Sequence, residues 1–330
     1  MSSSTVEVPT TQMRATSTAK TREPNFFVVG AAKAGTTSLV EYLRRHPDVF
    51  MPGGEMSQKE PSHFCDLLGP VPPWLEKYRE FNSYLELFAD AGECRAVGEA
   101  SVGYLTSAGA ENRIHARFPD ARIIIMLRNP ADRVYSWYSF MCQLGIEPGR
   151  SFERALAEED ERTALAAQRR DSWFSDHATV YFRYGLIASD VERFMRRFPR
   201  EQIHVVLFDD LKARPKETTR AVYEFLGVAA DFTPSFKIYN PTWFPFSVRL
   251  QHFLAMQCRT HPLLPHRAPV RFVDERVIPF AGKANAVLGR LRTRVFNPAT
   301  RRELLNRYRE DIQRTEALIG RRLDGWLRDA

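Results

Sequence analysis

The sequence predicts an α/β fold, a P-loop-like three-layer sandwich in which a central parallel sheet of about five strands is flanked by helices. Two observations support this prediction. Five short apolar runs alternate in several places with segments of helical period, as expected of a parallel sheet covered by helices. A glycine-rich turn follows the first run directly and leads into a helix. The five runs are residues 26–29, 49–51, 96–98, 123–127 and 203–208.

The helices expected between and after these strands have recognisable ends. The first begins near Thr36, whose hydroxyl can cap free N–H groups, and stops before Pro47. The second begins at Pro130, a favoured first-turn residue, and extends to Gly145. Helical patterns also cover residues 151–169, 187–198, 215–226 and 301–327.

The chain of 330 residues is interpreted as one domain behind a short tail. Residues 1–24, which are rich in Ser and Thr, are expected to be disordered, and residues 25–330 to form a single domain. Residues 234–298 carry many prolines and clustered aromatics without a clear period. We therefore expect a variable region of loops and short helices there.

Composition narrows the class of protein. Hydrophobic residues make up 44% of the chain, which is ordinary for a globular protein, and no apolar run reaches the roughly 20 residues of a membrane-spanning helix. The four cysteines are scattered, so we expect a reducing cytoplasmic location and no metal site. The net charge of +7 is compatible with a protein that binds a nucleic acid, an anionic membrane surface or a small polyanionic substrate. The oligomeric state cannot be deduced from the sequence.

The segment NFFVVGAAKAGTTSL, which starts at Asn25, is similar to a phosphate-binding loop with a displaced lysine. Gly30 and Gly35 have Walker A spacing, but Lys33 lies between them instead of after the second glycine. A glycine-rich turn between a buried strand and a helix presents N–H groups to an anion. Residues 30–38 are therefore predicted to hold a phosphate-type group, and an ordinary βα turn is the alternative.

The strand at residues 123–127 adds a second candidate anion site. It ends in Arg128-Asn129-Pro130, where a nucleoside triphosphatase would place an aspartate for Mg²⁺. A cation at this strand end would lie beside the first loop, at the carboxyl edge of the sheet. The two elements together indicate a ligand phosphorylated at two positions.

These residues resemble the sulfotransferase superfamily that uses 3′-phosphoadenosine 5′-phosphosulfate (PAPS). FFVVGAAKAGTTSL is similar to its 5′-phosphosulfate loop, and IIIMLRNPADRVYSWYSF to its 3′-phosphate element. GEASVGYL, VVLFDDLKARP and the ending RRELLNRYREDIQRTEALIGRRLDGW also match. The resemblance implies transfer of a sulfuryl group from PAPS to a hydroxyl by in-line displacement, with 3′-phosphoadenosine 5′-phosphate (PAP) as product and no metal.

The resemblance also assigns the donor-binding residues. Lys33 would stabilise the departing phosphate, and Arg128 and Ser136 would bind the 3′-phosphate, the arginine through a charge-assisted fork. Arg292 or Arg294 could reach the same phosphate, although a solvated basic turn is the favoured interpretation of both. The remaining donor-binding residues would be Ala34, Gly35, Thr36, Thr37 and Ser38.

A base near the sulfur must take the proton of the attacking hydroxyl. SQKEPSHF resembles the K-E-P/V-H-F-F segment of the carbohydrate and heparan-type members, which implies Glu60 as general base and Lys59 as a contact of the acceptor or the sulfonate. Ser62 displaces the histidine by one place. His63 is therefore the second candidate for the base. The alternative interpretation of His63 is a surface histidine without a role in the reaction.

The acceptor is the least specified part of the site. A carbohydrate or glycolipid is the first choice, on the KEP resemblance, and a hydroxylated natural product is the next. The variable region at 234–298 is expected near the acceptor, with Trp243 as a substrate-binding residue. Further aromatics could form an apolar or sugar-stacking lining, or could simply be core: Trp173, Phe174, Tyr181, Phe244 and Phe246.

Two other classes of function compete with this one. A P-loop nucleoside or small-molecule kinase would need ATP and Mg²⁺, and both the lysine placement and Arg128 argue against it. A noncatalytic nucleic-acid-binding protein would show binding to any polyanion that weakens steeply with salt. We expect no nucleic-acid partner.

Overall fold

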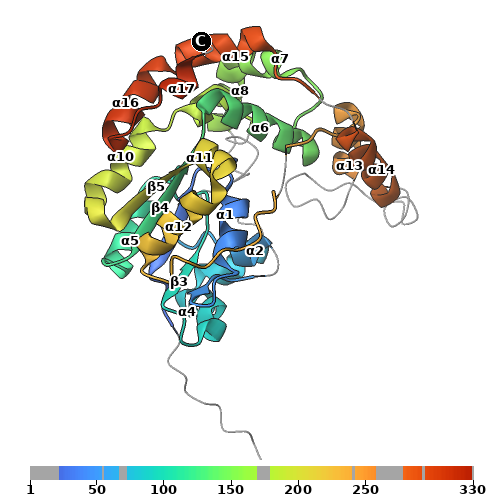
Figure 1. The fold of residues 1–330 in the computed structure, drawn as a ribbon. Coiled ribbons are helices and arrows are strands. Elements are labelled where there is room, and N and C mark those ends of the chain that lie inside the picture. Colours follow the sequence, from blue (N-terminus) through green and yellow to red (C-terminus); the bar gives the residue numbers. More distant parts are fainter. Residues whose placement is uncertain are drawn as a thin grey trace, which may run out of the picture.

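A computed structural model of the chain describes residues 22–53, 56–66, 73–168, 179–239, 242–257, 278–291 and 294–328. Strands and helices alternate along these ranges (Figure 1). Most of the predicted tail lies outside the described residues. Arg22 and Glu23, which the prediction assigned to the tail, contact the body of the protein: Arg22 donates to the carbonyl of Gly92, and Glu23 pairs with Arg117.

The described residues form a five-stranded parallel sheet with the order β2-β3-β1-β4-β5. β1 (Phe26–Gly30) is buried along its whole length and lies between β3 (Ala96–Glu99) and β4 (Arg122–Leu127). β2 (Val49–Phe50) and β5 (Ile203–Leu207) form the two edges. Each predicted strand is therefore confirmed, with an end that differs by one residue.

The helices of the described residues range from single turns to the 14 residues of α6. Short 3-10 helices lie at Lys77–Arg79, Glu86–Ala91 and Arg200–Gln202. The α-helices are α1 (Thr36–Leu43), α2 (Met56–Lys59), α3 (Pro73–Glu76), α4 (Phe81–Leu85), α5 (Ala110–Arg117), α6 (Pro130–Gln143), α7 (Phe152–Ala157), α8 (Glu159–Gln168), α9 (Tyr181–Gly185), α10 (Ala188–Arg197), α11 (Phe208–Ala213), α12 (Pro215–Leu226), α13 (Val248–Gln257), α14 (Ile278–Arg290), α15 (Pro298–Arg307), α16 (Arg309–Ile319) and α17 (Asp324–Leu327).

Helices cover both faces of the sheet. α1 packs beside α12 on one face, and α5 packs beside α10 on the other (Figure 1). Right-handed crossovers explain this division. The connection from β1 to β2 runs toward the β2 edge of the sheet, whereas the connections from β3 to β4 and from β4 to β5 run toward the β5 edge. Connections of one handedness that run in opposite directions place their helices on opposite faces. The prediction of an α/β three-layer sandwich is confirmed.

Two long helical patterns are interrupted where the sequence alone suggested continuity. Residues 301–327 contain three helices, α15 to α17, and Gly320 ends the second of them in a left-handed conformation with φ 65°. Residues 151–169 contain α7 and α8, which are separated at Glu158. No helix in the described ranges combines the length and the apolarity that crossing a bilayer would require.

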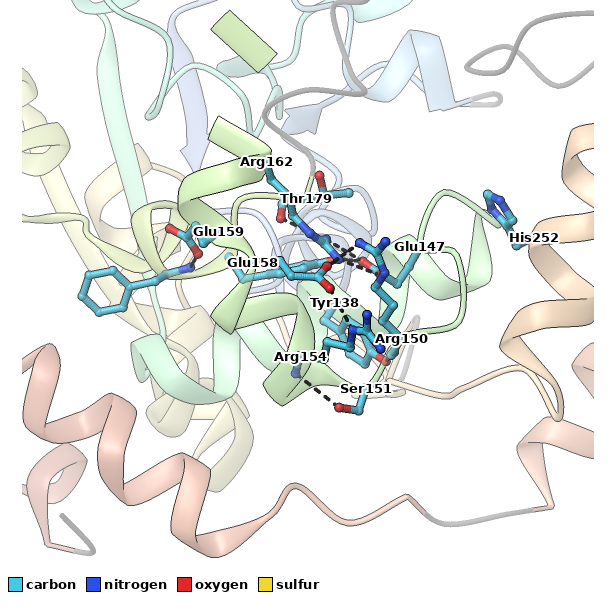
Figure 2. A network of polar contacts seen from close by, with 12 residues as sticks. Tyr138, Glu147, Arg150, Ser151, Arg154, Glu158, Glu159, Arg162, Thr179 and His252 are labelled. Atoms are coloured by element: carbon cyan, nitrogen blue, oxygen red, sulfur yellow. Dashed lines mark hydrogen bonds and ion pairs between the residues drawn. The ribbon is translucent and has the colours of Figure 1, made fainter. Parts of the chain in front are cut away.

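A buried ion pair explains the position of α8. Figure 2 shows the carboxylate of Glu158 among Arg150, Arg154 and Arg162, and the guanidinium of Arg162 reaching Glu147. The two hydrogen bonds between Arg162 and Glu147 are 3.0 and 3.1 Å long, and the hydroxyl of Tyr181 donates to the same carboxylate at 2.7 Å. This network fastens α8 and α9 to the end of α6.

Candidate active site

The loop after β1 and the residue after β4 meet at the carboxyl edge of the sheet. The backbone N–H of Ala31 donates to the carbonyl of Met126 at 2.7 Å, so the two chains leave the sheet side by side. Arg128 Nη1 then donates to the carbonyl oxygen of Lys33 at 3.0 Å. The two candidate anion sites therefore adjoin, as expected from their position after neighbouring strands.

Gly35 gives the loop a shape that a residue with a side chain would not readily adopt. Its φ is +87°, and a Cβ atom at this position would lie 2.7 Å from Cδ2 of Phe208. Lys33 is also left-handed, with φ 64°. Gly35 is the N-cap of α1 and supplies no side-chain cap, so the first N–H groups of α1 stay available to an anion.

The other loop residues surround this helix start in different ways. Ala34 is fully buried and can offer only its backbone, and Thr36 is also buried. The hydroxyl of Thr37 accepts a hydrogen bond from Lys59 Nζ at 3.3 Å. The hydroxyl of Ser38 accepts one from the backbone N–H of Tyr239 at 3.2 Å.

Lys33 belongs to the glycine-rich loop at residues 30–38, and its amine lies near an aromatic ring and three charged residues. Its Nζ is 4.6 Å from the ring centroid of Phe140 on α6. Burial, together with the cations Arg128 and Lys59, lowers the pKa of Lys33 to about 8, and the charge of Glu60 opposes this shift. The charge of this lysine is therefore poorly solvated and only partly compensated, as required of a group that is to receive an anion.

Arg128 follows β4 directly, and Ser136 lies on α6. The guanidinium of Arg128 lies over the ring of Phe208 at 4.6 Å, and burial lowers its pKa. Ser136 and Phe140 are one helical turn apart on α6, so Ser136 lies on the helix face that looks toward Lys33. Its hydroxyl is 2.8 Å from that of Thr242, a neighbour that the sequence did not indicate.

Lys59 and Glu60 lie beside the donor loop. Lys59 Nζ is 3.0 Å from Glu60 Oε1 and also donates to Thr37, so one amine links the candidate base to the start of α1. Backbone contacts hold the following residues, because the N–H of Ser62 donates to the hydroxyl of Ser101 at 2.9 Å. The structure thus brings the KEP segment and the glycine-rich loop into contact although 22 residues separate Thr37 from Lys59.

His63 lies in a cluster of aromatic rings. Its Nδ1 donates to the carbonyl of Tyr78 at 2.6 Å, and its ring stacks on Tyr84 with a centroid distance of 4.6 Å. Phe64 meets the other side edge-on at 4.7 Å. Burial lowers the pKa of His63. These contacts give His63 a structural role in the aromatic cluster, and the ranking of Glu60 above His63 as the base stays a prediction.

The predicted acceptor aromatics differ in their burial and in their contacts. Tyr181 and Phe244 are buried in the core, which agrees with the core interpretation of both. The ring of Trp243 lies 5.1 Å from the guanidinium of Arg290, and its carbonyl accepts a hydrogen bond from Gln143 at 2.7 Å. Trp173, Phe174 and Arg292 lie outside the described residues.

Arg294 is exposed and lies over the ring of Phe244 at 5.1 Å. Together with Arg150 and Arg249 it lines a cavity of about 370 Å³. None of the donor-binding residues lines this cavity. The favoured interpretation of Arg294 as a solvated basic residue fits this position.

Three aromatic residues that the sequence did not single out complete the surroundings of Lys33 and Glu60. Phe140 lies under Lys33, and the ring of Trp137, on the same helix, stacks on Tyr184 of α9 at 4.8 Å. Burial raises the pKa of Tyr184 to about 12, and the negative charge of Glu60 adds to this rise. The helical spacing of Trp137 and Phe140 was visible in the sequence, but their proximity to the two loops depends on tertiary contacts.

The fold and these charges define an α/β protein that can hold a ligand with two anionic groups. Comparison with known proteins then gives the family: residues 23–240 match the family model described as the sulfotransferase domain. The chain belongs to this family and is a sulfotransferase, which confirms the resemblance stated from the sequence.

Similar proteins agree with this assignment. Heparan sulfate glucosamine 3-O-sulfotransferase 6 of Homo sapiens is 30% identical over 266 residues, which are 78% of this chain and 70% of that protein. The protein of the same name from Mus musculus is 29% identical, over 81% of this chain and 72% of that protein. A crystal structure of a sulfotransferase from Alicyclobacillus acidocaldarius superposes with a TM-score of 0.67 at 31% identity, covering 93% of this chain and 100% of that one.

Proposed function

We propose that this sulfotransferase moves the sulfuryl group of PAPS to a hydroxyl of a carbohydrate or glycolipid. The observation that carries the proposal is the hydrogen bond between Arg128 and the Lys33 carbonyl, which joins two cationic elements at one edge of the sheet. A single nucleotide with phosphates at both ends of its ribose can bridge two such elements. The names of the heparan sulfate relatives support a carbohydrate acceptor.

In the proposed reaction the donor phosphates are held from three sides. The N–H groups at the start of α1, with the Thr37 hydroxyl, bind the 5′-phosphate, and Arg128 and Ser136 bind the 3′-phosphate. Lys33 stabilises the negative charge that develops on the bridging oxygen. Preorganised cations are effective in this role because they need no rearrangement when the charge appears.

Glu60 is the proposed general base. As the acceptor oxygen forms a bond to sulfur, the bond from sulfur to the bridging oxygen breaks, PAP leaves, and Glu60 takes the acceptor proton. The contact of Lys59 with both Glu60 and Thr37 places the carboxylate next to the donor loop. Trp137, Phe140 and Tyr184 are then candidates for contact with the acceptor ring.

A kinase is not favoured. β4 ends at Leu127 and is followed by Arg128 and Asn129, so no acidic side chain stands where a P-loop kinase would hold Mg²⁺. The side chain of Asn129 is used to cap α6, through hydrogen bonds from the N–H groups of Ala131 and Asp132. The cytoplasmic location stays a prediction that rests on the scattered cysteines.

The test combines donor binding with group transfer. PAP should raise the melting temperature of the protein, and ATP with Mg²⁺ should raise it less; the reverse order would favour a kinase. Labelled sulfate should pass from PAPS to at least one member of a panel of oligosaccharides and glycolipids. If PAP binds but phenols alone accept sulfate, the donor assignment holds and the carbohydrate assignment is wrong.

Glu60→Gln separates the role of the base from donor binding. Because an amide cannot take the proton, kcat should fall about 100-fold or more while the PAP affinity changes little. Glu161→Gln, a change at an exposed position on α8, is the matched control and should leave both unchanged. A Glu60→Gln variant with full kcat would remove Glu60 from the mechanism.

A further inference from the structure

α13 and α14 form a helical pair at the side of the molecule, apart from the central sheet (Figure 1). The pair is fastened to the end of α6 by polar groups. Gln251 on α13 donates to the carbonyl of Gln143 at 2.9 Å, and His252 Nδ1 is 2.6 Å from the carbonyl of Gly145. The connection between the two helices lies outside the described residues.

The inward face of α14 is polar. Asn285 is only 3% exposed, and its Oδ1 accepts from the N–H of Ser247 at 2.8 Å. Its Nδ2 donates to the carbonyl of Ser247 and to Gln251 Oε1, each at 3.0 Å. One turn later, Gly289 approaches the backbone so closely that a Cβ atom would lie 2.1 Å from the carbonyl oxygen of Phe244. Amide hydrogen bonds and close backbone contact therefore hold α14 in place.

The outward face of α14 is apolar, which reverses the usual arrangement of a surface helix. Phe280 is 76% exposed, and Leu291, which directly follows the last residue of α14, is 79% exposed. Val287 and Leu288 lie between them and are also exposed. We call these four residues the apolar stripe. On α13, Phe253 is a further large exposed apolar residue.

In the described residues of α13, α14 and the segments next to them, the charged side chains are all basic. Among residues 242–257, 278–291 and 294–298 there is no aspartate or glutamate. The same ranges contain Arg249, Lys283, Arg290 and Arg294. Lys283 is exposed and lies one helical turn from Phe280, beside the apolar stripe. An apolar strip whose described neighbours on these helices are basic is complementary to a surface that is apolar inside and anionic outside.

We infer that the α13–α14 pair docks on an anionic lipid surface. The apolar stripe enters the boundary between headgroups and acyl chains, and the basic side chains contact the lipid phosphates. The segment that leads into α13 carries Thr242 and Trp243, which contact Ser136 and Gln143 on α6. Docking therefore brings the face of α6 that carries Ser136 close to the membrane. This inference goes beyond the proposed function, and its test needs no sulfate transfer.

The experiment measures binding of the full chain to vesicles by co-sedimentation. The protein should bind vesicles of phosphatidylcholine with phosphatidylglycerol and should bind much less to phosphatidylcholine alone. Replacing two large apolar side chains of the stripe, in Phe280→Ser with Leu291→Ser, should lower the partition coefficient about tenfold or more. Lys283→Gln should lower it about fivefold, since each basic residue near such a surface contributes about 1 kcal/mol.

Ile238→Ser is the matched control, because Ile238 is 74% exposed but lies outside the helical pair. It should bind vesicles as the unchanged protein does. Melting temperature and PAP binding, measured for every variant, show that the fold and the donor site are intact. Failure of PAP binding in the unchanged protein would count against the proposed function and leave the membrane inference standing.

Three results would overturn the inference. The first is no binding to anionic vesicles, and the second is binding that the double serine variant and Lys283→Gln leave unchanged. The third is a concentration-dependent dimer in light scattering that the double serine variant dissociates, without vesicle binding by the unchanged protein. That last result would assign the apolar stripe to contact with a second copy of the chain.

Discussion

Replacing Lys33 by methionine should stabilise the unliganded protein while it removes activity. The charged amine lies close to Arg128 and Lys59, and Glu60 is the carboxylate whose charge opposes theirs. Burial and the two cations lower the pKa of Lys33 from 10.5 to about 8. The unfolded chain therefore binds this proton more tightly than the folded protein does, and the charge disfavours folding. Methionine keeps an unbranched side chain, one atom shorter than that of lysine, and removes the charge.

The pKa difference sets the size of the effect. A difference of about 2.5 between 10.5 and about 8 corresponds to about 3 kcal/mol, at about 1.4 kcal/mol for each pKa unit. Because Lys33 keeps some contact with water, we expect a gain of about 1–3 kcal/mol, or about 2–6 °C in melting temperature for a chain of this size. The gain should be fully present below pH 8 and should disappear as the pH rises from about 8 to about 10.5, where the unchanged protein also loses the charge.

The assay is thermal or urea unfolding of both proteins without ligand, at several pH values, together with turnover of PAPS. The exposed Lys212→Met on α11 is the control and should change stability by less than about 0.5 kcal/mol. Turnover should be lost in the Lys33 variant because the departing phosphate has no cation at its bridging oxygen. A Lys33→Met protein that is less stable than the unchanged one at pH 7, or that turns over normally, would refute this reasoning.

Further predictions concern the same site and its supports. In kinetics, kcat/KM should fall as the pH rises through about 8, because Lys33 then loses its proton; a flat profile to pH 10 would contradict this. Gly35→Ala should weaken PAP binding at least tenfold in calorimetry, since its backbone is left-handed and its Cβ would collide. Glu147→Leu should cost about 3 kcal/mol in urea unfolding because it removes both short hydrogen bonds of the largely buried Arg162 and leaves its longer contact with Glu158, whereas adding Arg162→Met should restore most of the loss. His63→Phe should keep kcat near normal in the sulfate-transfer assay; a loss as large as that expected for the proposed base would move that role to His63.

The sequence was sufficient for the sheet and for the adjacency of the two candidate anion sites, because both depend on local patterns. Buried parallel strands are continuous apolar runs, so β1 and β4 could be recognised from composition alone. The glycines at 30 and 35 indicated a turn with a backbone conformation that favours glycine over other residues. The proximity of Lys33 and Arg128 followed from one further assumption, that the two strands are neighbours, and the strand order confirms it.

The acceptor side could not be derived in the same way because it depends on contacts between distant segments. Nothing local indicates that Tyr184 of α9 would stack on Trp137 of α6, or that Thr242 would reach Ser136. The ranking of Glu60 above His63 rested on a resemblance. That the histidine ring belongs to an aromatic cluster appears only in the folded chain, because its neighbours Tyr78 and Tyr84 come from another segment.

The arrangement around Lys33 also explains why this site requires a ligand. Lys33 lies near the cations Arg128 and Lys59 and the carboxylate of Glu60, Arg128 also lies near Asp132 and Asp209, and burial lowers the pKa values of both Lys33 and Arg128. Burial of the Lys33 charge, together with its repulsion by Arg128 and Lys59, destabilises the unliganded protein, and a dianionic phosphate beside Lys33 offsets this cost. The free energy of donor binding should therefore include the relief of this unfavourable electrostatic energy as well as the new hydrogen bonds. It follows that PAP should raise the pKa of Lys33, so that binding takes up protons near pH 8. Calorimetry in two buffers with different ionisation enthalpies would measure this uptake, and binding without proton exchange at that pH would show that the phosphate does not approach Lys33.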